Sequence, residues 1–234
     1  MTARAVRATA WAGGLAAAGW CLPALAPRVP LACRALGAPR RIDSDRAVAV
    51  TFDDGPHPEG TPAVLAALAA AGATATFFLV GEQVERDPAL AREVAAAGHA
   101  VGVHAHRHRL PLRLTSRAFA DDLARAHAAI ADAAGVRPAL YRPPYGKFSW
   151  PGLRAVRARG LDPLLWSRDS RDFTPGARVD SIVAAATRDL RGGDVILLHD
   201  SDAYGAEGSH RRTAAALPRV LEEIARRGLE TAAG

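Results

Sequence analysis

Residues 47–56, AVAVTFDDGP, join a short apolar run to two adjacent aspartates and a Gly-Pro turn. The run from Ala47 to Phe52 has the composition of a strand that is buried on both faces, as in parallel sheets covered by helices. Asp53 and Asp54 follow at its carboxyl end, where open α/β sheets and α/β barrels place their chemistry. Two neighbouring buried carboxylates repel each other and need a cation or a proton. The alternative is a surface turn in which the aspartates are capping residues.

After this stretch the chain alternates short apolar runs with helical patterns, which predicts an α/β fold with a parallel sheet, open or closed into a barrel. Further strands are predicted at residues 74–80, 99–103, 139–141, 164–166 and 195–198. Helices are predicted to start at the caps Thr61-Pro62, Asp87-Pro88 and Ser116, and to cover residues 153–159, 181–190 and 213–227. The last strand is short, so poor closure of a barrel is expected there.

Ionisable side chains follow five of the predicted strands. They are Asp53 with Asp54, His104, Arg142, Asp169 with Asp172, and His199. Because the carboxyl ends of parallel strands meet at one edge, these groups are expected to converge on a single site. Purely structural roles would scatter them over both ends of the sheet.

A metal site is predicted from the spacing of two histidines. His104 and His108 are four residues apart, so one helical turn would place both rings on the same side. With one aspartate of the pair they give two histidines, one carboxylate and an open position, as in hydrolytic zinc sites. The other aspartate is then placed to accept a proton from water. His99 and His106 are expected to face elsewhere.

Two other interpretations of this histidine pair are open. Surface helices often carry histidines at the same spacing without binding a metal. Two histidines and one carboxylate also hold iron in non-haem oxygenases. An aspartate pair, an arginine at a strand end and a distant histidine would not naturally accompany an oxygenase site.

The first forty residues differ from the rest of the chain. Arg4 and Arg7 precede an uncharged stretch over residues 8–27, which indicates an export signal or a single membrane anchor. We expect an uncleaved anchor, so that residues 1–41 are a membrane segment with a linker and residues 42–234 form a domain outside the cytoplasm, membrane-anchored or secreted. The alternative is a buried helix.

Composition limits the chemistry and the partners. Both cysteines, Cys21 and Cys33, lie in the first segment. Any metal in the domain must therefore be held by histidine and carboxylate. The formal net charge of +6 suits anionic partners such as nucleic acid, anionic lipid or acidic cell-wall polymers. No basic run is interleaved with aromatic residues, so we expect no nucleic-acid partner.

Five segments resemble, in order, the five motifs of the polysaccharide deacetylases, the NodB-homology domain of carbohydrate esterase family 4. They are TFDDGP (51–56), HAHRH (104–108), RPPYG (142–146), DSRDF (169–173) and LLH (197–199). The resemblance covers roughly residues 45–230. It implies a distorted (β/α) barrel that uses a divalent metal, most often Zn²⁺ with Co²⁺ or another ion as alternatives. The implied reaction is hydrolysis of acetyl groups on a polysaccharide.

The resemblance also implies a role for each matching position. Asp54, His104 and His108 are the expected metal ligands. Asp53 is the expected general base, and Arg142 the residue that pairs with it. Taken alone, Arg142 would also fit a structural ion pair.

The remaining matches concern the leaving group and the acetyl group. His199 resembles the general acid and Asp172 the acid that orients it, since a poor amine leaving group needs a proton. Tyr145 matches the position whose backbone N–H stabilises an oxyanion, and Leu197 a wall of the acetyl pocket. Phe173 stands where the family usually has tryptophan, which removes an indole N–H from the sugar groove. Ala105 stands where serine or threonine is usual, so activity with altered affinity is expected.

The motifs leave the substrate open. Peptidoglycan N-acetyl sugars are favoured by the basic charge and the membrane segment, and chitin oligomers also fit. An acetyl-xylan O-deacetylase and a catalytically silent sugar-binding barrel are the alternatives. Residues 200–212, rich in glycine and polar residues, are expected to form one wall of the groove. We expect a monomer.

Overall fold

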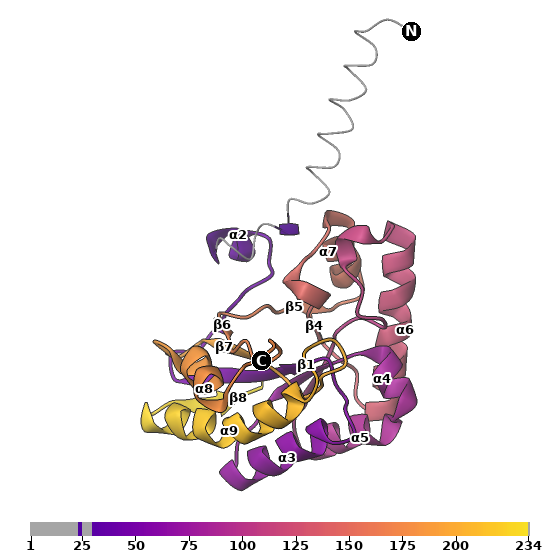
Figure 1. Cartoon of the computed structure of the whole chain (residues 1–234). Helices are drawn as coiled ribbons and strands as arrows, with labels where there is room; N and C mark the ends of the chain where they lie inside the picture. The colour runs from indigo at the N-terminus through magenta and orange to yellow at the C-terminus, as the bar shows by residue number, and fades with distance from the viewer. Residues whose placement is uncertain (1–22, 25–29, 234) are drawn as a thin grey trace, which may run out of the picture.

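The structure is a computed structural model that describes residues 23–24 and 30–233. Its centre is a parallel sheet with the strand order β5-β4-β3-β2-β1-β7-β6, and β8 pairs with β1 (Figure 1). The strands are β1 (Ala47–Asp53), β2 (Thr76–Leu79), β3 (Ala100–Val103), β4 (Leu140–Tyr141), β5 (Asp162–Pro163), β6 (Arg168–Asp169), β7 (Val195–His199) and β8 (Glu230–Ala232). The predicted parallel α/β architecture is confirmed.

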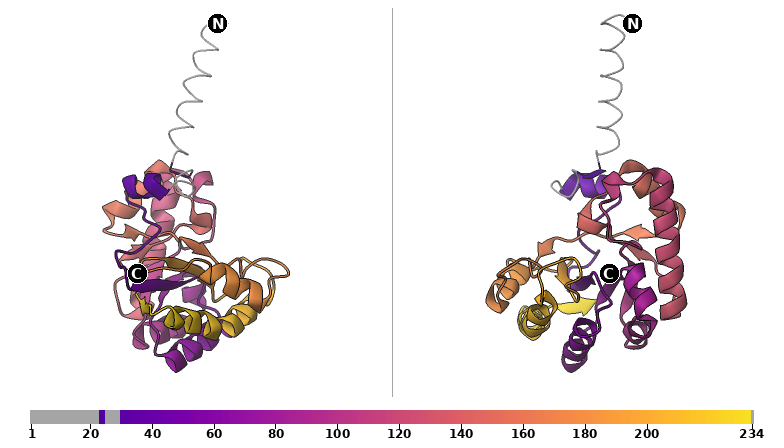
Figure 2. Two further views of the ribbon diagram at one scale, coloured as in Figure 1. Left: turned by 90° about the vertical axis from the view of Figure 1, so that its left-hand side faces the viewer. Right: turned by 45° about the vertical axis from the view of Figure 1, so that its right-hand side comes forward.

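Helices form an outer layer around the curled sheet (Figures 1 and 2). They are α2 (Pro30–Ala35), α3 (Gly60–Ala71), α4 (Gly81–Arg86), α5 (Pro88–Ala96), α6 (Ser116–Ala134), α7 (Trp150–Ala158), α8 (Val179–Thr187) and α9 (Ser209–Arg226). Helix α9 packs between α3 and α8, and α6 packs against α4 and α5. Helix α4 was not predicted, because six residues are too few to display a helical period.

Alternation along β1 separates the core from the site. Val48, Val50 and Phe52 belong to the large apolar core beneath the helices, whereas Ala49 packs with a smaller cluster inside the barrel. Because side chains alternate between the two faces of a strand, Thr51 and Asp53 also face inward. The strand therefore buries an apolar outer face and presents a carboxylate inside the barrel.

The barrel does not close between β5 and β6. Residues 164–166, predicted as a strand, instead link these two short edge strands. The reason lies in their carbonyl groups, because the buried Arg142 guanidinium donates to Leu164 O (3.0 Å) and Leu165 O (3.1 Å). The prediction was wrong here, and it was also wrong to place the poor closure at the last strand, since β8 pairs with the first half of β1.

Two helix caps differ from those predicted. Helix α6 is capped by Thr115, whose side chain accepts from Ala118 N (3.2 Å), and Ser116 is its first residue. Helix α3 begins at Gly60, two residues before the expected first position Pro62, and the Thr61 hydroxyl donates to Asp200 instead of capping. Asp87 caps α5 as predicted.

The predicted signal or anchor segment lies mainly in residues 1–22 and 25–29, which are outside the described part of the chain. Among the described helices, none is long and apolar enough to cross a membrane. Cys33 and Ala38 are buried in the core, so the chain already packs on the domain before residue 41. The domain boundary between residues 41 and 42 stays a prediction.

Candidate active site

Asp54, His104 and His108 form a compact group at the carboxyl end of the sheet. Oδ1 of Asp54 is 3.5 Å from His104 Nε2 and 3.4 Å from His108 Nε2. Each of the three residues offers one possible ligand atom, and these three atoms lie within 4.8 Å of one another. Ligands about 2 Å from one tetrahedral zinc ion are roughly 3.3 Å apart, so the spacing suits a single small cation. Both aspartates of the motif are buried, which excludes the alternative of a surface turn.

The chemistry of this group fits a divalent cation. Burial lowers the pKa of His104 and of His108 to about 3, so both rings are neutral. His104 Nδ1 lies 2.8 Å from the carbonyl of Arg142; it donates there, and the lone pair of its Nε2 is left to bind a metal ion. Burial raises the pKa of Asp54 to about 7, and its Oδ1 has no hydrogen-bond partner in the described chain. A cation would satisfy that buried oxygen and stabilise its charge.

A loop, not a helical turn, brings the two histidines together. Residues 104–110 are irregular, and Ala105 adopts the left-handed region with a φ of 70°. Neighbouring residues at the start of α4 hold the backbone of this loop, because the carbonyls of Ala105 and His106 accept hydrogen bonds from Gly81 N and Glu82 N. The predicted helical turn is therefore wrong, although both rings do face one aspartate.

The other two histidines of this stretch lie outside the group, as expected. The His99 ring packs on Phe77, with centroids 5.5 Å apart. Nε2 of His106 is 3.8 Å from a carboxylate oxygen of Glu85. Neither of them belongs to the set of ligand atoms around Asp54.

Asp53 and Arg142 form a buried ion pair beside the ligands. Arg142 Nη1 is 2.7 Å from Asp53 Oδ1 and also donates to the Thr51 hydroxyl at 2.7 Å. Burial raises the pKa of Asp53, and the Arg142 guanidinium offsets part of that rise. The second oxygen of Asp53, Oδ2, is 3.8 Å from His104 Nε2 and faces the ligand group. One oxygen is thus held by arginine while the other is available to take a proton.

His199 and Asp172 form a second pair on another side of the ligands. His199 Nδ1 is 2.8 Å from Asp172 Oδ1, and Asp172 Oδ2 accepts from His199 N and the Thr213 hydroxyl, both at 2.7 Å. Burial alone would lower the pKa of His199, but the Asp172 carboxylate raises it to about 10. The other ring nitrogen of His199, Nε2, lies 4.0 Å from Asp54 Oδ2. A proton acceptor and a proton donor therefore lie beside one candidate metal position.

Comparison with known proteins identifies the family. A family model described as "Polysaccharide deacetylase" matches residues 40–164. The chain belongs to the polysaccharide deacetylase family. The peptidoglycan-N-acetylglucosamine deacetylase of Bacillus cereus is 34% identical over 190 residues, which cover 80% of this chain and 85% of that protein. A chitooligosaccharide deacetylase of Bradyrhizobium sp. is 36% identical over 197 residues, which cover 81% and 89% respectively.

A solved structure extends the comparison to the fold. The family 4 carbohydrate esterase from Streptomyces lividans, in complex with acetate, aligns with a TM-score of 0.72 at 35% identity. The alignment covers 80% of this chain and 92% of that one. The distorted barrel of the polysaccharide deacetylase type is thereby confirmed. The family generally uses a divalent metal, and the Asp54 group could hold one.

The residues matched to the acetyl and sugar positions of the polysaccharide deacetylases surround these pairs. Tyr145, in a 3₁₀ turn over Pro144–Gly146, has a φ of 60° and contacts the His108 ring with its exposed side chain. The Phe173 ring packs edge-on against His199, with centroids 5.0 Å apart. Leu197 is buried and, like Val195 on the same strand, faces the inside of the barrel.

Asp169 is the one strand-end group that the structure assigns to a local turn. Its Oδ1 accepts from Arg171 N at 3.0 Å, as in an Asx turn. Asp172, three residues later in the same motif, is the carboxylate that reaches His199. Only one of the two predicted acids after this strand therefore joins the site.

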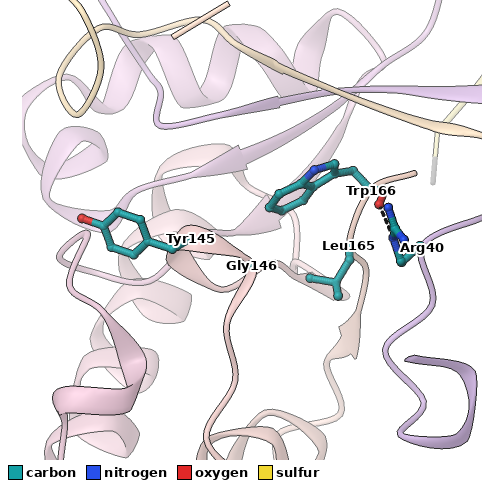
Figure 3. Close-up of a pocket in the computed structure, with 5 residues that line it drawn as sticks. All are labelled: Arg40, Tyr145, Gly146, Leu165 and Trp166. Atoms are coloured by element: carbon teal, nitrogen blue, oxygen red, sulfur yellow. Dashed lines mark hydrogen bonds between the residues drawn. The ribbon is translucent and has the colours of Figure 1, made fainter. Parts of the chain in front are cut away.

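A pocket opens beside the Tyr145 turn. It is lined by Arg40, Tyr145, Gly146, Leu165 and Trp166, and the Trp166 indole is directed toward the turn (Figure 3). A Cβ at Gly146 would lie 2.6 Å from the indole, and the φ of 65° also favours glycine there. Arg40 closes the other side, where its Nε donates to Trp166 O at 2.7 Å.

Several contributing residues were missed in the sequence. They are Thr51, Trp166, Tyr204 and Thr213. Trp166 was visible only as the end of an apolar run, and Thr51 as a polar residue within a buried strand. Tyr204 lies in the segment predicted as a groove wall, but nothing in its surroundings indicated that it stacks on His108.

Proposed function

We propose that this protein is a metal-dependent hydrolase that removes N-acetyl groups from a polysaccharide and releases acetate. The observation that carries the proposal is the convergence of Asp53 and His199 on the ligand group formed by Asp54, His104 and His108. Amide hydrolysis needs a proton acceptor for water, a proton donor for the amine and an electrophile for the carbonyl. The two pairs and the ligand group have the chemistry for these three tasks.

We propose Zn²⁺ as the ion, with Co²⁺ or another divalent cation as alternatives. Asp54, His104 and His108 would hold it, since two neutral imidazoles and one carboxylate suit zinc and leave a position open. When bound, such an ion supplies a Lewis acid that polarises the acetyl carbonyl.

Asp53 acts on the attacking water. Arg142 fixes Oδ1 of this carboxylate, so Oδ2 takes the proton as the water oxygen bonds to the acetyl carbon. The backbone N–H of Tyr145 is proposed to stabilise the oxyanion that forms on the carbonyl oxygen. Leu197 would wall the pocket that receives the acetyl methyl group.

His199 acts on the leaving nitrogen. The amine is a poor leaving group until it is protonated, so Nε2–H of His199 donates its proton as the C–N bond breaks. Asp172 holds Nδ1–H and keeps the ring charged, because the pKa of His199 is raised to about 10. Phe173 packs on this ring and would border the sugar groove.

Peptidoglycan N-acetyl sugars are the proposed substrate, with chitin-like oligomers second. The names of the Bacillus and Bradyrhizobium relatives and the net charge of +6 support this order. We also propose a location outside the cytoplasm, membrane-anchored or secreted, on the basis of the apolar stretch over residues 8–27. We further propose that the protein is a monomer.

The test is acetate release from acetylated peptidoglycan, chitopentaose and acetyl-xylan, each with and without a chelator. Release from the N-acetylated glycans that stops with chelator and returns with zinc is the expected result. Release from acetyl-xylan alone would make the protein an O-deacetylase. Binding of a glycan with no release from any of the three would make it a silent sugar-binding barrel.

A further inference from the structure

The two ligating histidines are held in place by different means. Nδ1 of His104 has the carbonyl of Arg142 at 2.8 Å, which is the kind of hydrogen bond that orients most metal-binding histidines. Nδ1 of His108 is buried and has no such partner in any other described residue. Since His108 also lies in an irregular loop, some other contact must fix its ring.

Tyr204 supplies that contact. Its ring lies parallel to the His108 ring, with centroids 4.3 Å apart and an interplanar angle of 15°. Tyr145 meets His108 edge-on at 4.8 Å, so two aromatic rings restrain the imidazole. Aromatic pairs at these separations attract each other beyond the area that they bury.

Tyr204 is itself braced against the fold. Its hydroxyl donates to Glu82 Oε1 at 2.7 Å and accepts from Gln83 Nε2 at 3.4 Å, so the ring is tied to helix α4. Its own loop is closed by a hydrogen bond from Gly208 N to Asp202 Oδ2 at 2.7 Å. A ring tied at both ends can hold a neighbouring side chain in one orientation.

We infer that Tyr204 is a positioning residue for the metal centre. Its stacked ring holds His108 with Nε2 facing Asp54 Oδ1, 3.4 Å away, and takes the place of the missing hydrogen bond to Nδ1. This inference rests on the proposed metal ligands. Position 204 lies outside the five motifs that carry the resemblance to the family.

The test is the zinc affinity of the metal-free full chain, measured by competition with a chromophoric chelator and without any acetylated substrate. Loss of a contact that orients a metal-binding histidine typically weakens affinity about 10–100-fold, and we expect a loss of that size in Tyr204→Leu. Tyr204→Phe keeps the stacked ring and loses only the hydrogen bonds of the hydroxyl to α4, so we expect a smaller loss than in Tyr204→Leu. Wild-type affinity in Tyr204→Leu, or an equal loss in both variants, would overturn the inference.

Two controls separate positioning from other effects. Thermal unfolding in chelator reports whether each metal-free variant folds, and Tyr204→Ala replaces the leucine variant if that one does not. Asp54→Asn gives the loss expected when a ligand is removed. Wild-type zinc affinity in Asp54→Asn would contradict the proposed metal centre itself, which is a different outcome from a failure of the Tyr204 variants.

Discussion

Replacing Arg142 with methionine should destabilise the protein in a way that depends on pH. Arg142 and Asp53 are both buried, and the guanidinium is the cation that keeps this carboxylate charged. Without it Asp53 must take up a proton to remain in the fold. An aspartate in the unfolded chain has a pKa near 4, so at pH 7 this protonation costs about 1.4 kcal/mol per unit over three units, or about 4 kcal/mol.

The sign of the pH dependence follows from the same pKa. In Arg142→Met the folded-state pKa of Asp53 is raised above its unfolded value, so the variant binds a proton on folding. The loss in the free energy of unfolding that this protonation causes in Arg142→Met therefore shrinks as the pH falls. It is about 4 kcal/mol at pH 7 and about 1.4 kcal/mol at pH 5. A domain of ordinary stability, about 5–15 kcal/mol, remains folded over that range.

The assay is urea unfolding of the chelator-treated protein, with Asp53→Asn/Arg142→Met as the matched control. The carbonyls of Leu164 and Leu165 lose their donor in both proteins, so that cost cancels in the comparison. We expect the double variant to be the more stable at pH 7 and the two to converge toward pH 5. Equal stability of the two proteins at pH 7 would refute the buried ion pair as the source of the effect.

Three further predictions concern the acid, the metal and the pocket. Asp172→Asn should lower kcat/KM and move the alkaline limb of the pH profile of kcat/KM to lower pH. The proposed acid His199 acts only while protonated, and the Asp172 carboxylate raises the pKa of His199. An alkaline limb at the wild-type pH would count against the pairing of His199 with Asp172. Removal of metal with a chelator should abolish acetate release and added zinc should restore it, whereas release that continues in chelator at zero zinc content would contradict the metal centre. Gly146→Ala should destabilise the fold by more than the roughly 1 kcal/mol expected for the control Gly228→Ala. Both glycines have a positive φ, but only at position 146 would the added methyl group press on Trp166. Equal losses of stability in the two variants would rule out that contact.

Most of the strands, and the ionisable residues at their ends, could be predicted because the signal is local. A buried parallel strand appears in the sequence as a continuous apolar run. The first ionisable residue after it lies at the carboxyl edge of the sheet, and this position does not depend on the conformation of the loops. The pairing of Asp53 with Arg142 and of His199 with Asp172 also followed from the motif resemblance, and the structure places both pairs in contact.

Several other interactions that depend on the tertiary fold could not be predicted. The conformation of the His104–His108 loop depends on hydrogen bonds to the start of α4, and no spacing rule describes them. Residues 164–166 have the composition of a strand, but the carbonyls of Leu164 and Leu165 accept hydrogen bonds from the distant Arg142. Tyr204 reaches His108 only because β7 and β3 end at the same edge of the sheet, far apart in sequence.

The central claim is that Asp53 is the proton acceptor beside a metal held by Asp54, His104 and His108. Its most direct test is acetate release from N-acetylated peptidoglycan by the wild type and by Asp53→Asn, both brought to the same measured zinc content. We expect the variant to keep its zinc and to release acetate about 10²–10⁴-fold more slowly, the usual contribution of a general base. Zinc content and acetate release both equal to those of the wild type would contradict the account.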